Sequence, residues 1–392
     1  MLAHMGTVAR FPLTSLTCVL LRQLYRTLQM LTSSKTLHSI QVLRAIAALL
    51  VALFHAQQAF AKVGTPPAVA WESHLFAFGA VGVPIFFVIS GFIMIVTSRF
   101  EPEFRPYAFV KRRLMRIYPI YWICAAAYLA AHWLIAEPYS IGLSEALGAM
   151  FLLPADAPAI IGPAWTLSYE MFFYLCFAAV MPLGLSPGFW TLGSIFLGLV
   201  VVGALLEPQS PALHLATNSL LLEFIAGMGI GWLYRHGRLP RSGGTVQIVL
   251  AVILYGLGIV FGYDALPSVI AWGIPSTLLV LGVVCLEAQQ GTSAAVRRIG
   301  WLGDSSYALY LIHILVITLA LKLADFYQPL LAMEPALVAF LLAPVCVLIA
   351  EILHRGLERP LLQVLNPRRA LVPPHQAGHG DHRLDRKPKE FV

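Results

Sequence analysis

Two ionisable residues, Arg44 and His55, lie within one long apolar run of the chain, residues 40–56. Ionisable side chains are costly inside a membrane and usually face a protein interior or a water-filled cavity. Eleven residues of helix return to within about 20° of the same face and raise His55 about 16 Å above Arg44. One helix face would then carry a fixed cation near one membrane surface and a titratable base deeper inside. This suggests a path for a long anionic ligand with a reactive end.

Each member of this pair also has a plainer explanation. A neutral His55 at this depth could accept a proton as a general base, or it could be a structural histidine bonded to a neighbouring helix. Arg44 lies about four residues from the expected inner surface and could extend its guanidinium to the lipid headgroups. The depth of His55 favours function, because ionisable residues inside a membrane are functional by default.

A second basic group occurs at Lys111-Arg112-Arg113-Leu-Met-Arg116. On a helix, Arg113 and Arg116 are three residues apart and share a face. Guanidinium groups suit phosphate recognition, since their planar donors match its oxygens. The same cluster also fits a simple topology signal, so the residues alone leave both interpretations open.

A carboxylate and a tyrosine occur in the stretch that begins at Trp165. If this stretch is helical, Glu170 lies about five to seven residues below the outer surface, and Tyr174 shares its face. A buried carboxylate without a partner is costly, so Glu170 should meet one or be protonated. His55 lies at a similar depth, so we expect Glu170 to orient or charge-balance His55, an arrangement common in catalytic sites.

His313 reaches a comparable depth in a stretch where Tyr307, Tyr310 and His313 are each three residues apart. Such side chains often hydrogen-bond across helices in membranes, which is the interpretation we favour for the two tyrosines; for His313 a catalytic role is equally open. Ser90 lies among the small residues and the proline of another span, which permit close helix approach or line a cavity. Ser90 has no adjacent base in the sequence, so we expect it to contact substrate and not to act as a nucleophile.

Membrane-spanning helices must position these residues. Of 392 residues, 59% are hydrophobic and only 11% are charged, with a mean hydropathy of +0.78, whereas soluble domains carry about 25% charged residues. Apolar runs of about 20 residues have the length of a spanning helix. We therefore expect an all-α polytopic membrane helical bundle of about ten transmembrane helices. The runs are roughly 40–61, 78–98, 116–136, 163–183, 189–206, 212–234, 245–263, 267–287, 300–322 and 330–354.

The distribution of lysine and arginine predicts how these helices are oriented. If the N-terminus is cytoplasmic, ten spans place every lysine and arginine except Lys62 and Lys322 on the inner side, which is the positive-inside pattern. Both termini are then cytoplasmic, in an inner (plasma) membrane. The net charge of +7 reports this topology and does not indicate nucleic-acid binding. The five cysteines lie in apolar surroundings without paired spacing, so we expect neither a disulfide nor a metal site.

The same pattern divides the chain into an N-terminal extension (1–38), a membrane domain (39–366) and a polar tail (367–392). The extension fits either a helix lying on the membrane surface or a chain whose true start is Met30, and it lacks the small-residue cleavage site of a signal peptide. The tail has the composition of a disordered segment. The proline-rich outer segment at 137–162 could cap a cavity.

In this order, the motifs resemble those of the type-3 acyltransferase family, bacterial integral-membrane enzymes that O-acylate cell-surface polysaccharides. The resemblance covers about 40–360, nearly all of the membrane part, and is nearest to the exopolysaccharide acetyltransferases. The matching elements are Leu43-Arg44-Ala45 with His55, the segment 82–92, Arg113 and Arg116 followed by Ile117-Tyr118-Pro119, Trp165 with Glu170, the segment 306–313, and Glu358-Arg359-Pro360.

The resemblance implies acetyl-CoA or a related acyl-CoA as cytoplasmic donor, and a hydroxyl of a polysaccharide or lipid-linked glycan as acceptor. It assigns the basic motif to the donor and makes the histidine of the Arg–His pair essential. We therefore expect donor binding by Arg44, Arg113 and Arg116. The expected catalytic residues are His55, Glu170 and His313, and the expected substrate contacts are Trp165, Ser90 and Tyr174.

Two other classes of protein are compatible with the residues alone. A transporter or flippase for a lipid-linked glycan or small solute also uses intramembrane His, Glu and Arg, but transporters often show inverted repeats and paired broken helices, which the sequence does not convincingly show. An assembly subunit of an export complex would not need a histidine at the depth of His55. The series of motifs favours the enzyme.

Overall fold

The computed structural model describes residues 37–64, 75–98, 100, 104–135, 140–155, 160–241, 243–262 and 266–365. Within these ranges the regular structure is entirely helical, and ten helices are long and apolar enough to cross a membrane. The prediction of an all-α bundle with about ten spans is confirmed. The tail predicted at 367–392 and the extension predicted at 1–38, apart from its last two residues, lie outside the described residues.

The spans follow one another along the chain, several of them with a short 3₁₀ or π turn at one end. They are α2 (His38–Val63); Leu75–Thr97, which contains η1 (Phe78–Val81) and α4 (Gly82–Thr97); α5 (Pro106–Leu134); η2 (Gly162–Ala164), α7 (Trp165–Val180) and η3 (Met181–Leu183); α8 (Leu185–Leu206); α9 (Pro211–Thr217) with α10 (Leu221–Arg235); α11 (Gly244–Phe261); η5 (Val269–Gly273) with α12 (Ile274–Gln290); α14 (Ser306–Phe326); and α15 (Pro335–Leu353), η8 (His354–Glu358) and α16 (Arg359–Leu365). The short helices α6 (Leu143–Met150) and α13 (Ala294–Ile299), with η6 (Gly300–Gly303) and η7 (Gln328–Leu330), join them.

Two boundaries differ from the prediction for identifiable reasons. Helix α5 begins at Pro106 and not near residue 116, because Lys and Arg are good helix formers and proline is well suited to the first helical turn. The whole basic cluster therefore lies on the helix. Helix α14 begins at Ser306 and not near residue 300, since Gly300–Gly303 forms a separate 3₁₀ turn.

Glycines bring α4 into backbone contact with its neighbours. A Cβ added at Gly91 would lie 2.0 Å from the carbonyl oxygen of Phe224, and one at Gly227 would lie 1.9 Å from that of Val88. On the other side of α4, a Cβ at Gly82 would lie 2.3 Å from the carbonyl oxygen of Ala47 on α2. Small residues permit this close approach in membranes. The small residues in the span that contains Ser90 had predicted such close helix packing.

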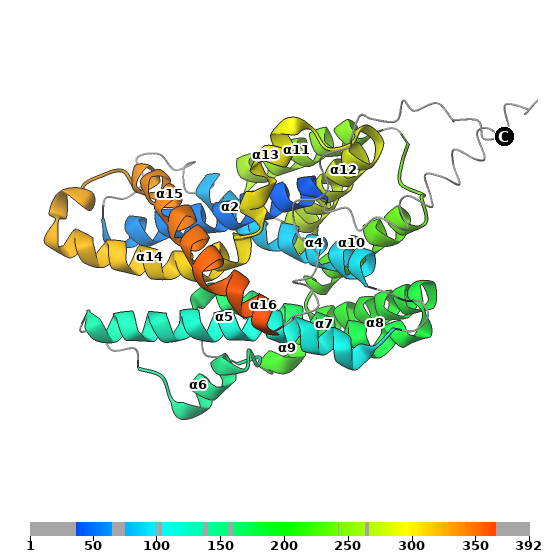
Figure 1. Ribbon diagram of the computed structural model, residues 1–392, viewed down its shortest axis with the longest axis horizontal. Coiled ribbons are helices and arrows are strands. Elements are labelled where there is room, and N and C mark those ends of the chain that lie inside the picture. Colours follow the sequence, from blue (N-terminus) through cyan, green and yellow to red (C-terminus); the bar gives the residue numbers. More distant parts are fainter. Residues whose placement is uncertain are drawn as a thin grey trace, which may run out of the picture.

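In Figure 1, α5, α7 and α8 lie on one side of the molecule, and α2, α14 and α15 lie on the other. Helices α4 and α10 pack against each other and connect the two sides, since α10 also contacts α8 and α4 also contacts α2. The largest group of buried apolar side chains lies around this junction, where Phe224 of α10 stacks on Phe87 of α4 and Phe173 of α7, each with ring centroids 4.4 Å apart. This core fixes α4 against α7, the two helices that carry Ser90 and Glu170.

Candidate active site

A pair of histidines joins α2 to α14. His313 Nε2 lies 3.3 Å from His55 Nδ1, and the His55 Nδ1 atom also lies 2.9 Å from the Val51 carbonyl oxygen. His313 is fully buried, and its Nδ1 lies 3.1 Å from the Leu309 carbonyl oxygen. His55 is half-buried. The two rings thus share one hydrogen-bonded chain between the backbones of the two helices.

This chain of contacts determines where the protons of the neutral rings lie. A carbonyl oxygen only accepts, so His313 Nδ1 must carry the hydrogen that points to Leu309, and His313 Nε2 is left as an acceptor. His55 Nδ1 then faces two acceptors and carries the hydrogen between them. The remaining nitrogen, His55 Nε2, has a lone pair and is free to accept a proton.

The expected partnership between Glu170 and His55 is wrong. Glu170 accepts hydrogen bonds from Ser90, at 2.9 Å, and from Tyr174, its own i+4 neighbour. His55 is paired with His313 instead, as the similar depths of the two histidines allowed. The rise of a helix gives the depth of a residue but not the direction in which its helix is turned. For this reason depth alone could not distinguish Glu170 from His313.

The three arginines expected to bind the donor line one cavity. Arg44 comes from α2, and Arg113 and Arg116 come from α5. Ser90, Glu170 and Tyr174 line the same cavity from α4 and α7. Among the described residues no ion pair joins these arginines to Glu170, so three guanidinium groups share a cavity with one carboxylate. Such a surplus of positive charge suits an anionic ligand.

Two of these guanidinium groups also contact neighbouring side chains. Arg44 is only 9% exposed, so it does not extend into the headgroups, and its Nη1 donates to Gln41 Oε1 at 2.8 Å. Gln41 in turn donates to Asp304 at 2.9 Å. Arg113 lies over the rings of Phe109 and Tyr174, with 5.3 and 5.4 Å to their centroids.

Arg113 also carries a donor without a partner. Its buried Nε meets no hydrogen-bond acceptor within the described part of the chain. A buried donor left unpaired is costly, which is the state expected of a group kept for a ligand.

The cavity and the histidine pair meet at Tyr310. The Tyr310 hydroxyl lies 2.5 Å from both the Pro163 carbonyl oxygen and Thr166 Oγ1, at the start of α7, and Tyr310 lines the arginine cavity. Its ring centroid is 6.1 Å from that of His313. Tyr307 likewise bonds across to α5, at the Ile117 carbonyl oxygen. The prediction that both tyrosines bond across helices is confirmed, and Tyr310 also stands between the arginines and the histidines.

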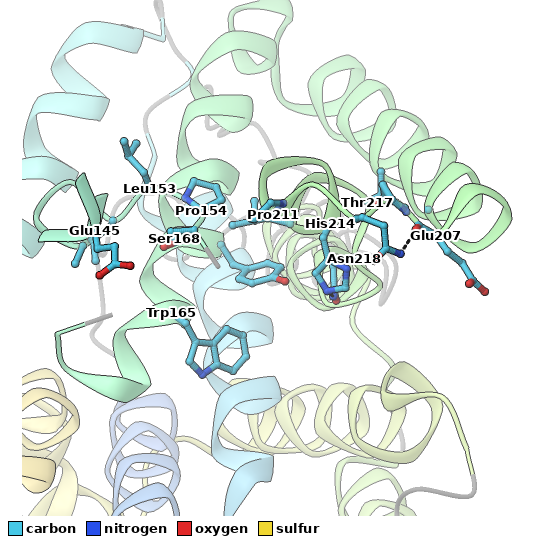
Figure 2. A pocket seen from close by; sticks show the side chains of 18 residues that line it. Glu145, Leu153, Pro154, Trp165, Ser168, Glu207, Pro211, His214, Thr217 and Asn218 are labelled. Carbon is cyan, nitrogen blue, oxygen red and sulfur yellow. Dashed lines mark hydrogen bonds between the residues drawn. The ribbon is translucent and has the colours of Figure 1, made fainter. Parts of the chain in front are cut away.

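Trp165 lies in a separate and larger pocket of about 640 Å³ (Figure 2). The pocket is lined by the start of α7, by α6 with the residues after it, and by the connection from α8 to α9. Trp165 is 45% exposed, and Tyr169 packs edge-on against it at 5.6 Å. Part of the segment predicted to cap a cavity, in α6 and from Leu152 to Ala155, lines this pocket. The three expected substrate contacts are therefore divided between two sites.

The first turns of α7 form the wall between the two cavities. Trp165, Ser168 and Tyr169 face the larger pocket, whereas Thr166 and Glu170 face the arginines. The sequence prediction missed Thr166, and it missed Gln41 and Asp304 behind Arg44. Gln41 could have been found, because it lies three residues before Arg44 on the same helix face; the other two are brought to the site only by the fold.

A family model described as an acyltransferase domain matches residues 37–355. The chain belongs to the type-3 acyltransferase family. It is therefore a multi-pass membrane acyltransferase, as the resemblance implied, and the family does not support the transporter or the assembly subunit.

Curated relatives agree with this assignment. The chain is 34% identical over 303 residues to the exopolysaccharide production protein ExoZ of Rhizobium meliloti (strain 1021), covering 74% of this chain and 92% of the relative. It is 26% identical over 374 residues to the acyltransferase MdmB of Streptomyces mycarofaciens, covering 86% and 94%. It is 22% identical over 373 residues to the peptidoglycan O-acetyltransferase OatA of Listeria monocytogenes serovar 1/2a, covering 84% and 56%. No solved structure gives a significant match.

Proposed function

We propose that this enzyme moves an acyl group, most simply acetyl, from cytoplasmic acyl-CoA to a hydroxyl of an exported or cell-surface polysaccharide. The observation that carries the proposal is the convergence of three arginines on one cavity whose wall includes Tyr310, the neighbour of the His313–His55 pair in which His55 Nε2 can accept a proton. An anion site and a base at opposite ends of one path fit a long anionic donor with a reactive end. Two of the relatives, an exopolysaccharide production protein and a peptidoglycan O-acetyltransferase, support a glycan acceptor.

The transfer follows from the assignment of protons. His55 Nε2 takes the proton of the acceptor hydroxyl as its oxygen attacks the thioester carbonyl. The tetrahedral intermediate collapses, the carbon–sulfur bond breaks, and the departing thiolate receives the proton from His55. An ester and free CoA result. His313 holds the other nitrogen of His55, so that Nε2 faces the substrate in its basic form.

The donor enters from the side of the arginines. Arg44 and His55 are eleven residues apart on α2, a rise of about 16 Å, so a ligand that reaches both must be elongated. The phosphates of CoA pair with Arg44, Arg113 and Arg116, and the acyl end points to His55. The cavity holds only about 80 Å³, so lining side chains such as Phe86 and Tyr310 move when the donor enters.

Glu170 acts within the donor cavity. Its bonds to Ser90 and Tyr174 lock the wall formed by α4 and α7, and its charge balances part of the charge of the arginines. In this proposal the arginines face the cytoplasm, both termini are cytoplasmic, and the protein resides in the inner membrane. The distribution of lysine and arginine supports this orientation.

The decisive experiment measures acyl transfer by the purified protein in lipid nanodiscs, with radiolabelled acetyl-CoA and polysaccharide from a strain that lacks the enzyme. His55→Ala should reduce transfer by about 10²- to 10⁴-fold, the usual contribution of a general base. The matched control is His236→Ala, because His236 is exposed at the end of α10 and should leave transfer unchanged. Wild-type rates in His55→Ala at equal protein level would refute the assignment, and label that never reaches the polysaccharide with the wild type would refute the function.

A further inference from the structure

The charged side chains that line the pocket of Trp165 are acidic, whereas most of those that line the arginine cavity are basic. Among the described residues that line the pocket of Trp165, there is no lysine or arginine, while two carboxylates, Glu145 and Glu207, are present. Figure 2 shows these two glutamates at opposite ends of the pocket, with Ser168 and His214 between them. A ligand bound here meets no fixed positive charge, so this pocket does not suit an anion.

The rest of the lining suits a sugar. Trp165 is 45% exposed, so its indole can present an aromatic surface to the apolar face of a sugar ring. Hydroxyl, amide and imidazole groups of Ser168, Asn218 and His214 lie around it and can both donate and accept hydrogen bonds. A volume of about 640 Å³ lies within the range of ligand pockets and accommodates a short oligosaccharide.

Two helices end at the rim of the pocket. Within the described part of the chain, two residues other than glycine have a positive φ: Leu152 at 55° and Glu207 at 43°. Leu152 follows α6 and Glu207 follows α8, and a left-handed residue is common where a helix ends. Both residues line this pocket, so these two helix ends form part of its rim.

The pocket shares a wall with the arginine cavity. This wall is the start of α7, and Pro163, in the 3₁₀ turn that precedes the helix, accepts the hydrogen bond of Tyr310, whose ring centroid is 6.1 Å from that of His313. A glycan stacked on Trp165 would thus lie at the outer end of the path from the arginines. Donor and acceptor would be held on the two faces of one helix.

We propose that this outer pocket binds the acceptor as an uncharged oligosaccharide segment stacked on Trp165, and that Glu145 and Glu207 exclude acidic sugars from it. This inference rests on the proposed function for the identity of the ligand. It adds the position of the glycan, the charge class that the pocket accepts, and the residues that select it.

A retention experiment tests the pocket directly. The surface polysaccharide of a strain lacking the enzyme is fragmented, and anion exchange separates neutral from acidic oligosaccharides. Each pool is passed over the protein in immobilised nanodiscs, and mass spectrometry quantifies the retained fragments. We expect retention of the neutral pool, about tenfold less retention with Trp165→Ala, and a comparable loss with Ser168→Leu, which fills the pocket while leaving the indole in place.

The control is Trp190→Ala, because Trp190 is also strongly exposed, at 63%, but does not line the pocket; it should retain fragments like the wild type. Glu145→Gln combined with Glu207→Gln should raise retention of the acidic pool about fivefold. Retention of neither pool, preference of the wild type for the acidic pool, or unchanged retention with both Trp165→Ala and Ser168→Leu would overturn the proposal.

Hydrolysis of acetyl-CoA, measured on the same nanodiscs, separates this test from that of the general function. If the wild type hydrolyses acetyl-CoA through His55 but retains no glycan, the pocket assignment fails while the proposed function stands. If glycan is retained through Trp165 but acetyl-CoA is neither bound nor hydrolysed, the pocket assignment holds while the proposed donor fails.

Discussion

His313 Nε2 lies 3.3 Å from His55 Nδ1, with the two rings tilted by 44°. This contact joins two helices whose histidines are 258 positions apart in the chain. It gives His55 a defined tautomer, because its Nδ1 hydrogen lies between His313 and the Val51 carbonyl oxygen. In the proposed mechanism the nitrogen that remains accepts the proton of the substrate, and His313 positions His55.

Removing His313 should therefore slow acyl transfer without weakening donor binding. In His313→Ala the Val51 carbonyl oxygen alone remains to orient His55, and we expect kcat to fall about tenfold, in line with the loss of one buried hydrogen bond. The KM for acetyl-CoA should change little. His313→Gln restores an acceptor and should recover part of the rate. A purely structural role for His313 would instead lower the amount of folded protein and leave the kcat of the folded fraction unchanged.

The four basic residues of the cluster should separate into two that bind the donor, Arg113 and Arg116, and two that do not, Lys111 and Arg112. Arg113→Ala combined with Arg116→Ala should raise the Kd for acetyl-CoA by about 10- to 100-fold, since hydrogen bonds to charged groups are worth about 1.5–3 kcal/mol each. Arg112→Ala is the matched control, because Arg112 is exposed and does not line the cavity. Equilibrium binding in nanodiscs measures both. Equal effects of the two changes, or none, would mean that the cluster serves only to set topology.

The sequence was sufficient to predict the helices and the depth of the residues on them. Apolar run lengths located all ten spans, and the helix rise placed His55 and His313 at one level. The sequence does not specify how each helix is turned about its own axis in the bundle. Glu170 has the right depth to meet His55, but its helix turns it toward Ser90 and Tyr174.

The pocket that contains Trp165 could not be predicted from the sequence as a unit. Glu145, Trp165 and Glu207 come from three separate elements and converge only because α6 and the connection from α8 to α9 fold toward the start of α7. Only Trp165 was identified, since an aromatic residue at the outer end of a span has a local signal. The combination of two carboxylates with no lysine or arginine among its described lining residues depends on which residues converge, so it could be seen only in the fold.

Donor binding by Arg44 should require an uncharged side chain at Gln41. Gln41 holds the guanidinium without cancelling its charge, because its amide accepts from Arg44 and donates to Asp304. Gln41→Glu would place a carboxylate 2.8 Å from the guanidinium, so we expect the Kd for acetyl-CoA to rise about tenfold, a difference of about 1.4 kcal/mol, with little change in kcat. Asp304→Asn preserves the acceptor for Gln41 and serves as the control. If Gln41→Glu binds the donor as well as the wild type, Arg44 is not a donor ligand.

The contact between α4 and α10 should be the most sensitive part of the scaffold. Gly227→Ala would put a methyl group 1.9 Å from the carbonyl oxygen of Val88, so the two helices must separate, and overpacking of this kind costs about 1–3 kcal/mol. Helix α4 carries Ser90, so the same shift should weaken its bond to Glu170 and lower the transfer rate. Gly198→Ala on α8 is the control, since nothing lies within 4 Å of the added methyl group. Thermal unfolding in detergent should show a lower Tm for Gly227→Ala and an unchanged or slightly higher Tm for Gly198→Ala. Equal Tm values for the two variants would contradict the close backbone contact between α4 and α10.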